Sequence, residues 1–325
     1  MSETKKLSLH PTQIVVLAFG TAVLLGTTIL MLPISTAAGN ETDLVTALFT
    51  AVSAVCITGL TVVDTGTHWS AFGQTAIMIM IQLGGLGIVS FATILGLLVS
   101  GRISLKDRLN TLSEAKIVGA DSLPKLLRAI LLVYFGFEAI LAAWLTQRLH
   151  FEYGFSFGDA LWYGTFHAIS SFNNGGFSLF SDYMIGFNTD FFFIAPVMLA
   201  VVVGGLGFPV LIELHERIWR LNRQSSGKPR RFSLHTRLTL GATVFLLVIG
   251  SLFIGALEWN NPNTIGGLSG LDKVWNTIFA AVMPRSGGLN SVDISQMDTA
   301  TWLGMDFLMF IGGGSASTAG GIKVT

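Results

Sequence analysis

The chain has 325 residues, of which 51% are hydrophobic and only 12% charged, with a formal net charge of zero. Soluble domains carry about a quarter charged residues, so this composition indicates a membrane protein. The single cysteine excludes an intramolecular disulfide and a cysteine-rich metal cluster. The six histidines lack metal-ligand spacing, and the common hydrolase and nucleotide-binding motifs are missing. We therefore expect no enzyme, no organic cofactor and no nucleic-acid partner.

Six long apolar segments occur in pairs, with a shorter segment between the members of each pair. The long segments are 12–35, 71–99, 126–147, 191–212, 236–257 and 301–312. All but the last approach the roughly 20 residues that a helix needs to cross the hydrocarbon core. The shorter segments, 43–57, 159–172 and 272–284, are too short to span it. We interpret them as half helices that enter and leave the membrane on one side.

Basic residues gather on one side of this arrangement. They precede the first long segment and fill 102–128 and 217–237, and the positive-inside rule makes that side cytoplasmic. The sequence predicts a multi-pass protein of the cell (cytoplasmic) membrane with a cytoplasmic N-terminus. The first segment is too long for a signal peptide, so we expect it to be retained. The basic stretches could instead bind acidic membrane lipid or a partner protein.

The three short segments share one pattern, which is visible in "DLVTALFTAVSAVCITGLTVVD" (43–64), "DALWYGTFHAISSFNNGGFSLFSD" (159–182) and "DKVWNTIFAAVMPRSGGLNSVD" (272–293). An opening aspartate precedes a shared glycine by 16, 17 and 16 residues, and a closing aspartate follows it by 5, 6 and 5. The glycines are Gly59, Gly176 and Gly288. One unit, long helix–half helix–loop–long helix, is therefore predicted three times in parallel orientation.

The loops after the half helices are candidate ion-binding sites. Irregular backbone at membrane depth must be buried or line a water-filled cavity, and backbone carbonyls can replace the hydration shell of potassium. Half-helix C-termini add partial negative charge. The candidate ion-binding residues are Cys56, Ile57, Thr58, Gly59, Asn173, Asn174, Gly175, Gly176, Ser286, Gly287 and Gly288. Asp64, Asp182 and Asp293 would concentrate cations at an outer mouth. Glycines that merely let helices pack are the alternative.

The motifs "SAVCITGLTVVDT", "SSFNNGGFSLF", "PRSGGLNSVD" and "FIGGGSASTAGGIKVT" resemble the Trk/Ktr/HKT superfamily of potassium transporters, nearest to the Ktr-type membrane subunit. The likeness covers essentially the whole chain. It implies an all-α membrane protein with four units around a central pore, K⁺ bound at the filter carbonyls, and filter glycines at Gly59, Gly176 and Gly288. Gly59 goes with potassium preference, whereas plant relatives with serine there favour sodium. It also implies Na⁺ as a possible coupling ion, a homodimer, and a cytoplasmic nucleotide-binding regulatory subunit of the KtrA/TrkA type.

Only three of the four units are found in this sequence, so we expect the fourth to be absent and the chain not to conduct alone. The expected organisation is a cytoplasmic N-terminus (1–11), three pore repeats separated by two cytoplasmic loops, and a final intramembrane loop. The repeats are 12–100, 126–222 and 236–325, and the loops are 101–125 and 223–235.

Residues 312–321 are predicted to be unwound, because five glycines in ten positions oppose a helix. The resemblance places an intramembrane gate loop here. Its residues are Gly312, Gly313, Gly314, Ser315, Ala316, Ser317, Thr318, Ala319, Gly320 and Gly321, with Lys323 at its lower end. The alternative is a helix-packing face. The related "QLGGLGIVSFA" (82–92) and "VVVGGLGFPVL" (201–211) are interpreted as close helix packing.

Three single residues near the loops have expected roles. A lumen-facing cation would repel potassium, so Arg285 should point away from the pore and support the filter, by bonding carbonyls or a carboxylate such as Glu138. Cys56 should be a small buried residue behind the filter, and His167 a satisfied core residue.

Potassium translocation has two competitors as a function. A secondary transporter of another monovalent cation or small solute is the alternative, but its inverted repeats are not found. A membrane enzyme lacks a nucleophile, base or metal set.

Overall fold

The computed structural model describes residues 11–39, 41–87, 123–222, 232–315 and 317–324. Within these ranges the regular structure is helical, and no strand longer than an isolated bridge is present. The two expected cytoplasmic loops and the N-terminus fall largely outside the described residues. The domain boundaries proposed there stay predictions.

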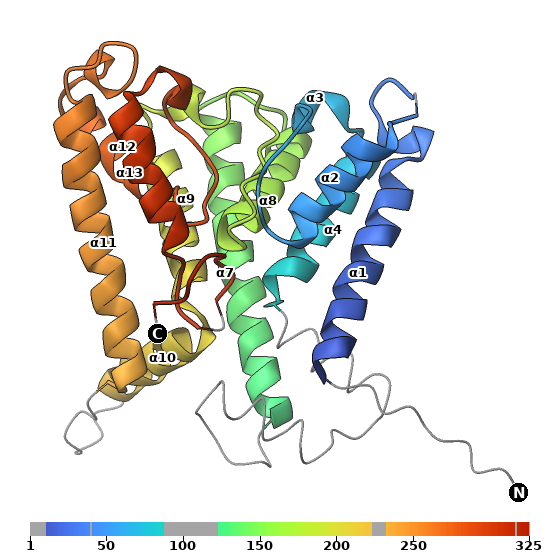
Figure 1. Cartoon of the computed structure of the whole chain (residues 1–325), viewed down its shortest axis with the longest axis horizontal. Helices are drawn as coiled ribbons and strands as arrows, with labels where there is room; N and C mark the ends of the chain where they lie inside the picture. Colours follow the sequence, from blue (N-terminus) through green and yellow to red (C-terminus); the bar gives the residue numbers. More distant parts are fainter. Residues whose placement is uncertain (1–10, 40, 88–122, 223–231, 316, 325) are drawn as a thin grey trace, which may run out of the picture.

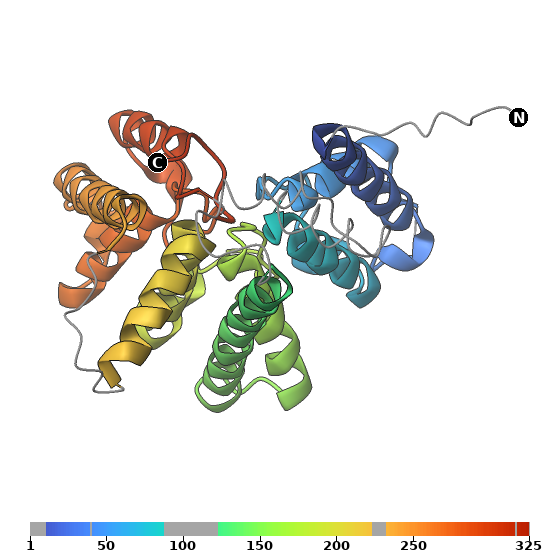
Figure 2. The same ribbon diagram turned by 90° about the horizontal axis from the view of Figure 1, so that it is seen from below.

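Nine helices make three similar groups, each with a first long helix, a half helix and a second long helix (Figure 1). The first group has α1 (Pro11–Leu30), α2 (Leu44–Val55) and α4 (Ala71–Gly85); the second has α7 (Leu123–Phe151), α8 (Phe157–Phe172) and α9 (Phe191–Leu206); the third has α11 (Leu234–Glu258), α12 (Gly270–Val282) and α13 (Thr299–Phe310). Figure 2 shows the groups fanning out around a shared centre. The order of helices in each group is the one expected from the sequence; that the three groups are repeats of one unit stays a prediction.

Further elements connect or extend these helices. They are α3 (Thr65–His68), α10 (Phe208–Asn222) and four 3₁₀ turns at Pro33–Ser35, Ile185–Phe187, Ile265–Gly267 and Ile294–Gln296.

Two of the three half helices, α2 and α8, begin at capping side chains. Asp43 accepts a 3.0 Å hydrogen bond from the Thr46 N–H at the start of α2, and Ser156 accepts one of 3.1 Å at the start of α8. Asp159 and Asp272 lie one turn inside α8 and α12. An acid in the first turn stabilises a helix through its dipole, so the aligned aspartates all favour the same helix start from two different positions.

The second long helix of the second group is shorter than the sequence predicted. The prediction of one continuous span over 191–212 is wrong, because the chain bends by 105° between α9 and α10. The bend lies at Gly207, whose φ of +88° is accessible to glycine. Within the segment predicted over 71–99, α4 ends at Gly85, and residues 88–99 lie outside the described residues. Among the described helices only α11 is long and apolar enough to cross a bilayer by itself; α9 with the first part of α10 passes as a bent pair.

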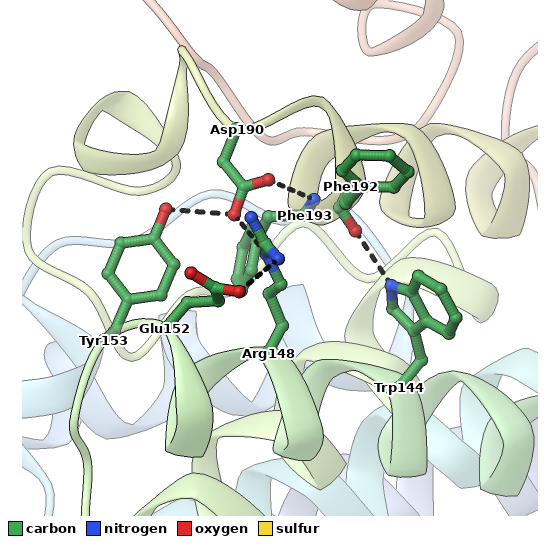
Figure 3. A network of polar contacts seen from close by, with 7 residues as sticks. All are labelled: Trp144, Arg148, Glu152, Tyr153, Asp190, Phe192 and Phe193. Carbon is green, nitrogen blue, oxygen red and sulfur yellow. Dashed lines mark hydrogen bonds and ion pairs between the residues drawn. The ribbon is translucent and has the colours of Figure 1, made fainter.

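A polar clamp joins the end of α7 to the start of α9 (Figure 3). Arg148 donates to Asp190 at 2.8 Å and to Glu152 at 3.0 Å, and the Tyr153 hydroxyl donates to Asp190 at 3.1 Å. Asp190 also caps α9. The third group has a corresponding clamp, in which buried Glu258 accepts hydrogen bonds from the Asp298 N–H and the Thr301 hydroxyl. These contacts set how the long helices of a group splay, and so fix the half helix between them.

Candidate functional site

The three loops share an unusual backbone conformation. In each, a residue with positive φ lies two positions before the shared glycine, which also has positive φ. The pairs are Ile57 (+55°) with Gly59 (+77°), Asn174 (+58°) with Gly176 (+72°), and Ser286 (+76°) with Gly288 (+70°). Non-glycine residues rarely adopt this conformation, so its recurrence at three matched positions indicates that the loops have one geometry.

The first two loops also have identical hydrogen bonds. The Cys56 N–H donates to the Val52 carbonyl as that of Asn173 donates to Ile169, at 2.8 and 3.0 Å. The next two residues repeat this match: Ile57 and Asn174 donate to Ala54 and Ser171, and Thr58 and Gly175 donate to Ser53 and Ser170. The third loop differs, because Gly287 and Gly288 both donate to the Met283 carbonyl.

The three shared glycines meet at the centre. A Cβ built on Gly176 would lie 2.8 Å from the Gly59 Cα and 3.2 Å from the Gly288 Cα. The reciprocal positions are equally tight, at 2.9 Å from Gly59 and 2.8 Å from Gly288 to the Gly176 Cα. Gly176 therefore lies between the other two. Any side chain here would meet backbone, so both space and conformation require glycine.

One expectation about the first loop is wrong. Cys56 is exposed, not buried behind the loop. It follows the last turn of α2 on a side that no described element covers, whereas its counterpart Asn173 is buried between helices.

The predicted gate segment leaves the helical conformation after α13 ends at Phe310. Its neck is closed by hydrogen bonds from the Gly312 N–H to the Ile322 carbonyl (2.9 Å) and from the Ile322 N–H to the Phe310 carbonyl (3.1 Å). Lys323 donates to the Ala319 carbonyl at 2.5 Å and the Ser317 hydroxyl at 3.3 Å. The segment is thus a compact loop; Ala316 lies outside the described residues.

The gate segment docks against two of the three central loops. The buried Arg285 donates to the Gly312 carbonyl at 3.0 Å, and the Gly320 N–H donates to the Ser286 hydroxyl at 2.9 Å. The Thr318 hydroxyl lies 3.3 Å from both the Asn174 side-chain oxygen and the Phe172 carbonyl. Arg285 thus bonds a carbonyl, as expected, but it is a carbonyl of the gate segment.

Glu138 is not the partner of Arg285. Its two carboxylate oxygens accept hydrogen bonds of 2.8 Å from the side-chain amides of Asn173 and Gln82. It therefore supports the second loop from α7. An acid within a membrane helix is itself a signal of function, but sequence alone did not pair Glu138 with Asn173, because 35 residues separate them.

The three closing aspartates accept backbone hydrogen bonds in the short turns that precede the second long helices. Asp64 accepts from the Thr67 N–H at 2.8 Å, Asp182 from Gly186 at 2.9 Å, and Asp293 from Ser295 at 2.9 Å. Burial opposes ionisation of Asp64, but hydrogen bonds from neighbouring hydroxyls and backbone N–H groups hold its pKa below the ordinary 3.8.

The glycines of the GGLG motifs pack closely, as predicted. A Cβ on Gly84 would overlap the Val55 carbonyl, and one on Gly204 would overlap the corresponding Phe172 carbonyl. The second motif does more than pack, because the Gly205 carbonyl accepts a 2.9 Å hydrogen bond from the Gly314 N–H of the gate segment.

His167 is a satisfied core residue, as expected. Its Nε2 accepts a hydrogen bond from the Leu179 N–H at 3.2 Å, and its Nδ1 donates to the Tyr163 carbonyl at 2.7 Å. This pattern requires the neutral ring.

The helical fold fits an all-helical membrane transporter. It matches the crystal structure of the potassium transporter TrkH from Vibrio parahaemolyticus with a TM-score of 0.69 at 17% identity, covering 100% of this chain and 61% of that one. A family model named TrkH, described as a cation transport protein, matches residues 2–325. The chain belongs to the TrkH family of cation transport proteins.

Two relatives have names that specify an ion. The chain is 42% identical over 318 residues to the Ktr system potassium uptake protein B of Bacillus subtilis, covering 97% of this chain and 68% of that protein. It is 34% identical over 325 residues to the potassium/sodium uptake protein NtpJ of Enterococcus hirae, covering 100% and 69%. Both relatives are transport proteins by name, and the chain spans about two thirds of their length.

Proposed function

We propose that this chain provides the larger part of the ion-translocating subunit of a potassium uptake system. The observation that carries the proposal is the meeting of Gly59, Gly176 and Gly288, each in a left-handed conformation at the end of a half helix. Backbone carbonyls in such loops can replace the water around K⁺. Potassium is named for both relatives.

In this proposal the filter consists of the eleven loop residues named above, and the acids Asp64, Asp182 and Asp293 lie at its outer mouth. The segment 312–321 is the gate on the cytoplasmic side. Its contacts with Asn174, Ser286 and Arg285 support this placement, because a loop bonded beneath the filter lies where it can obstruct an ion.

The partners follow from the same proposal. A Ktr system is named for several components, so we include a cytoplasmic nucleotide-binding regulatory subunit, and a homodimer in the cell membrane with its N-terminus in the cytoplasm. Sodium is included as a coupling ion, since NtpJ is named for both ions.

Uptake of potassium into cells that lack their own uptake systems tests the function. The complete protein that carries this chain should restore growth at low potassium and take up K⁺ in preference to Na⁺. Failure to take up K⁺ from a well-folded, membrane-inserted protein would contradict the proposal.

A further inference from the structure

The residue two positions before each filter glycine has a positive φ in all three loops. The residue there is Ile57 in the first loop, Asn174 in the second and Ser286 in the third. The two polar residues both contact the gate segment: Ser286 accepts from the Gly320 N–H, and Asn174 lies beside the Thr318 hydroxyl. Ile57 instead lies against Gly84 of α4.

We infer that Ser286, assisted by Asn174, is a latch that holds the gate segment closed against the filter. The inference rests on the proposed function and assigns these side chains a role separate from ion coordination by their backbone carbonyls. They are positioning residues, since they act through the gate segment and not on the ion.

The contacts of Ser286 and Asn174 with the gate segment differ in length. The Gly320–Ser286 hydrogen bond, at 2.9 Å, has ordinary length. The Thr318 hydroxyl is 3.3 Å from Asn174 and equally far from the Phe172 carbonyl, so its single proton is shared between two long contacts. Ser286 should therefore hold the gate more strongly than Asn174.

Arg285 adds to the latch at the other end of the segment. Its Nη2 donates to the Gly312 carbonyl, but its Nε is buried with no partner among the described residues. A small cavity lies beside it, lined by residues that include Gly205, Thr243, Gly313 and Ala319. The bond from Arg285 to the Gly312 carbonyl therefore adds a second attachment of the gate segment beside the filter.

Glycine substitutions test the latch cleanly, because they remove the side chain without straining a left-handed backbone. In the complete transporter, Ser286→Gly should raise potassium flux about fivefold per folded protein, which corresponds to loss of one typical hydrogen bond. Asn174→Gly should raise it less. Thr28→Val, which removes an exposed hydroxyl hydrogen bond to the Leu24 carbonyl within α1, lies outside the filter and the gate segment. It is the control and should leave flux unchanged.

Thr318→Val provides the complementary test from the gate side, and it keeps the shape of the side chain. Combined with Asn174→Gly it should give no more flux than the larger single effect, because both remove one contact. Combined with Ser286→Gly the effects should multiply. If Ser286→Gly fails to fold, Thr318→Val and Asn174→Gly still decide. A rise in flux in both single variants that does not increase further in the double variant supports the latch, and no rise in flux overturns it.

Size-exclusion profile and thermal unfolding report folding beside flux. A side chain that only stabilises the fold would lower stability and flux together, and that result would overturn the inference. So would a flux for well-folded Ser286→Gly equal to that of Thr28→Val. Absence of potassium uptake by the unsubstituted protein would instead contradict the proposed function.

Discussion

The side-chain amide of Asn173 donates a 2.8 Å hydrogen bond to the buried carboxylate of Glu138, which ties the second loop to α7. The other carboxylate oxygen accepts from Gln82 on α4. Glu138 thus joins the first and second groups of helices, next to the second loop, whose Gly176 lies between Gly59 and Gly288.

Glu138→Leu should destabilise the protein by about 1–3 kcal/mol, because two buried amides lose their acceptor. Glu138→Gln should recover only part of this loss, since its amide can accept from one partner but not from both. Thermal unfolding of the purified protein measures the effect. Glu152→Gln is the control: Glu152 forms an exposed pair with Arg148, and such pairs contribute little. Equal stability of Glu138→Leu and the control would contradict the support role.

Gly59→Ser should weaken the preference for potassium over sodium. The added side chain would approach the Gly176 Cα to 2.9 Å and the Gly175 carbonyl to 3.0 Å at a φ of +77°, so the ring of carbonyls must distort. Uptake of the two ions, measured side by side, checks the prediction. Unchanged discrimination would mean that Gly59 is not a filter residue.

Two substitutions distinguish the capping role of the closing aspartates from the role of their charge. Asparagine at Asp64, Asp182 and Asp293 keeps an oxygen for the backbone N–H but removes the charge, whereas alanine removes both. If the acids form an entry field, the triple asparagine variant should raise the apparent KM for K⁺ at low ionic strength and less so at high. An identical KM at both salt concentrations leaves only the capping role.

The pKa of Asp64 gives a pH dependence with a defined sign. Because the folded-state pKa is depressed below 3.8, the contribution to stability is fully present above about pH 4 and is lost as the pH falls through the folded value. Asp64→Asn should therefore flatten the acid limb of thermal stability. An acid limb that matches the unsubstituted protein would assign the effect to other carboxylates.

The repeated unit and its half helices could be predicted from the sequence because their signals are local. The segment expected over 43–57 is α2 (Leu44–Val55), and that expected over 272–284 is α12 (Gly270–Val282). Segment length and the shared spacing of aspartates and glycine sufficed. The break at Gly207 lies inside a continuous apolar run, which hides it from the hydropathy pattern, and the local signal for it is glycine followed by Pro209.

Contacts between residues far apart in the sequence could not be predicted either. The Arg285–Gly312 and Glu138–Asn173 contacts join distant segments, and residue type alone left Arg285 with several possible acceptors. The exposure of Cys56 likewise depends on what packs beside α2, which a hydrophobic sequence pattern does not specify.

Deletion within Gly313–Gly320 in the complete protein should raise potassium flux and leave the ion preference largely intact. The neck hydrogen bonds between Gly312, Ile322 and Phe310 lie outside the deleted stretch, so the surrounding helices can keep their places. The rate of uptake per folded transporter measures it. Low flux from an equally well-folded deletion would assign the segment to packing and not to gating.

The most direct test of the central claim, that the three loops together form the potassium pathway, is uptake by a Gly176→Ala variant. Gly176 touches the backbone of both other glycines, so a single methyl group disturbs all three loops at once. Gly136→Ala, in α7 with open space around its added Cβ, is the control. In cells that lack other uptake systems, with equal amounts of folded protein in the membrane, we predict at least about a tenfold loss of K⁺ uptake for Gly176→Ala, as a barrier increase of about 1.4 kcal/mol gives, and no loss for Gly136→Ala. Equal K⁺ uptake by the two variants would contradict the claim.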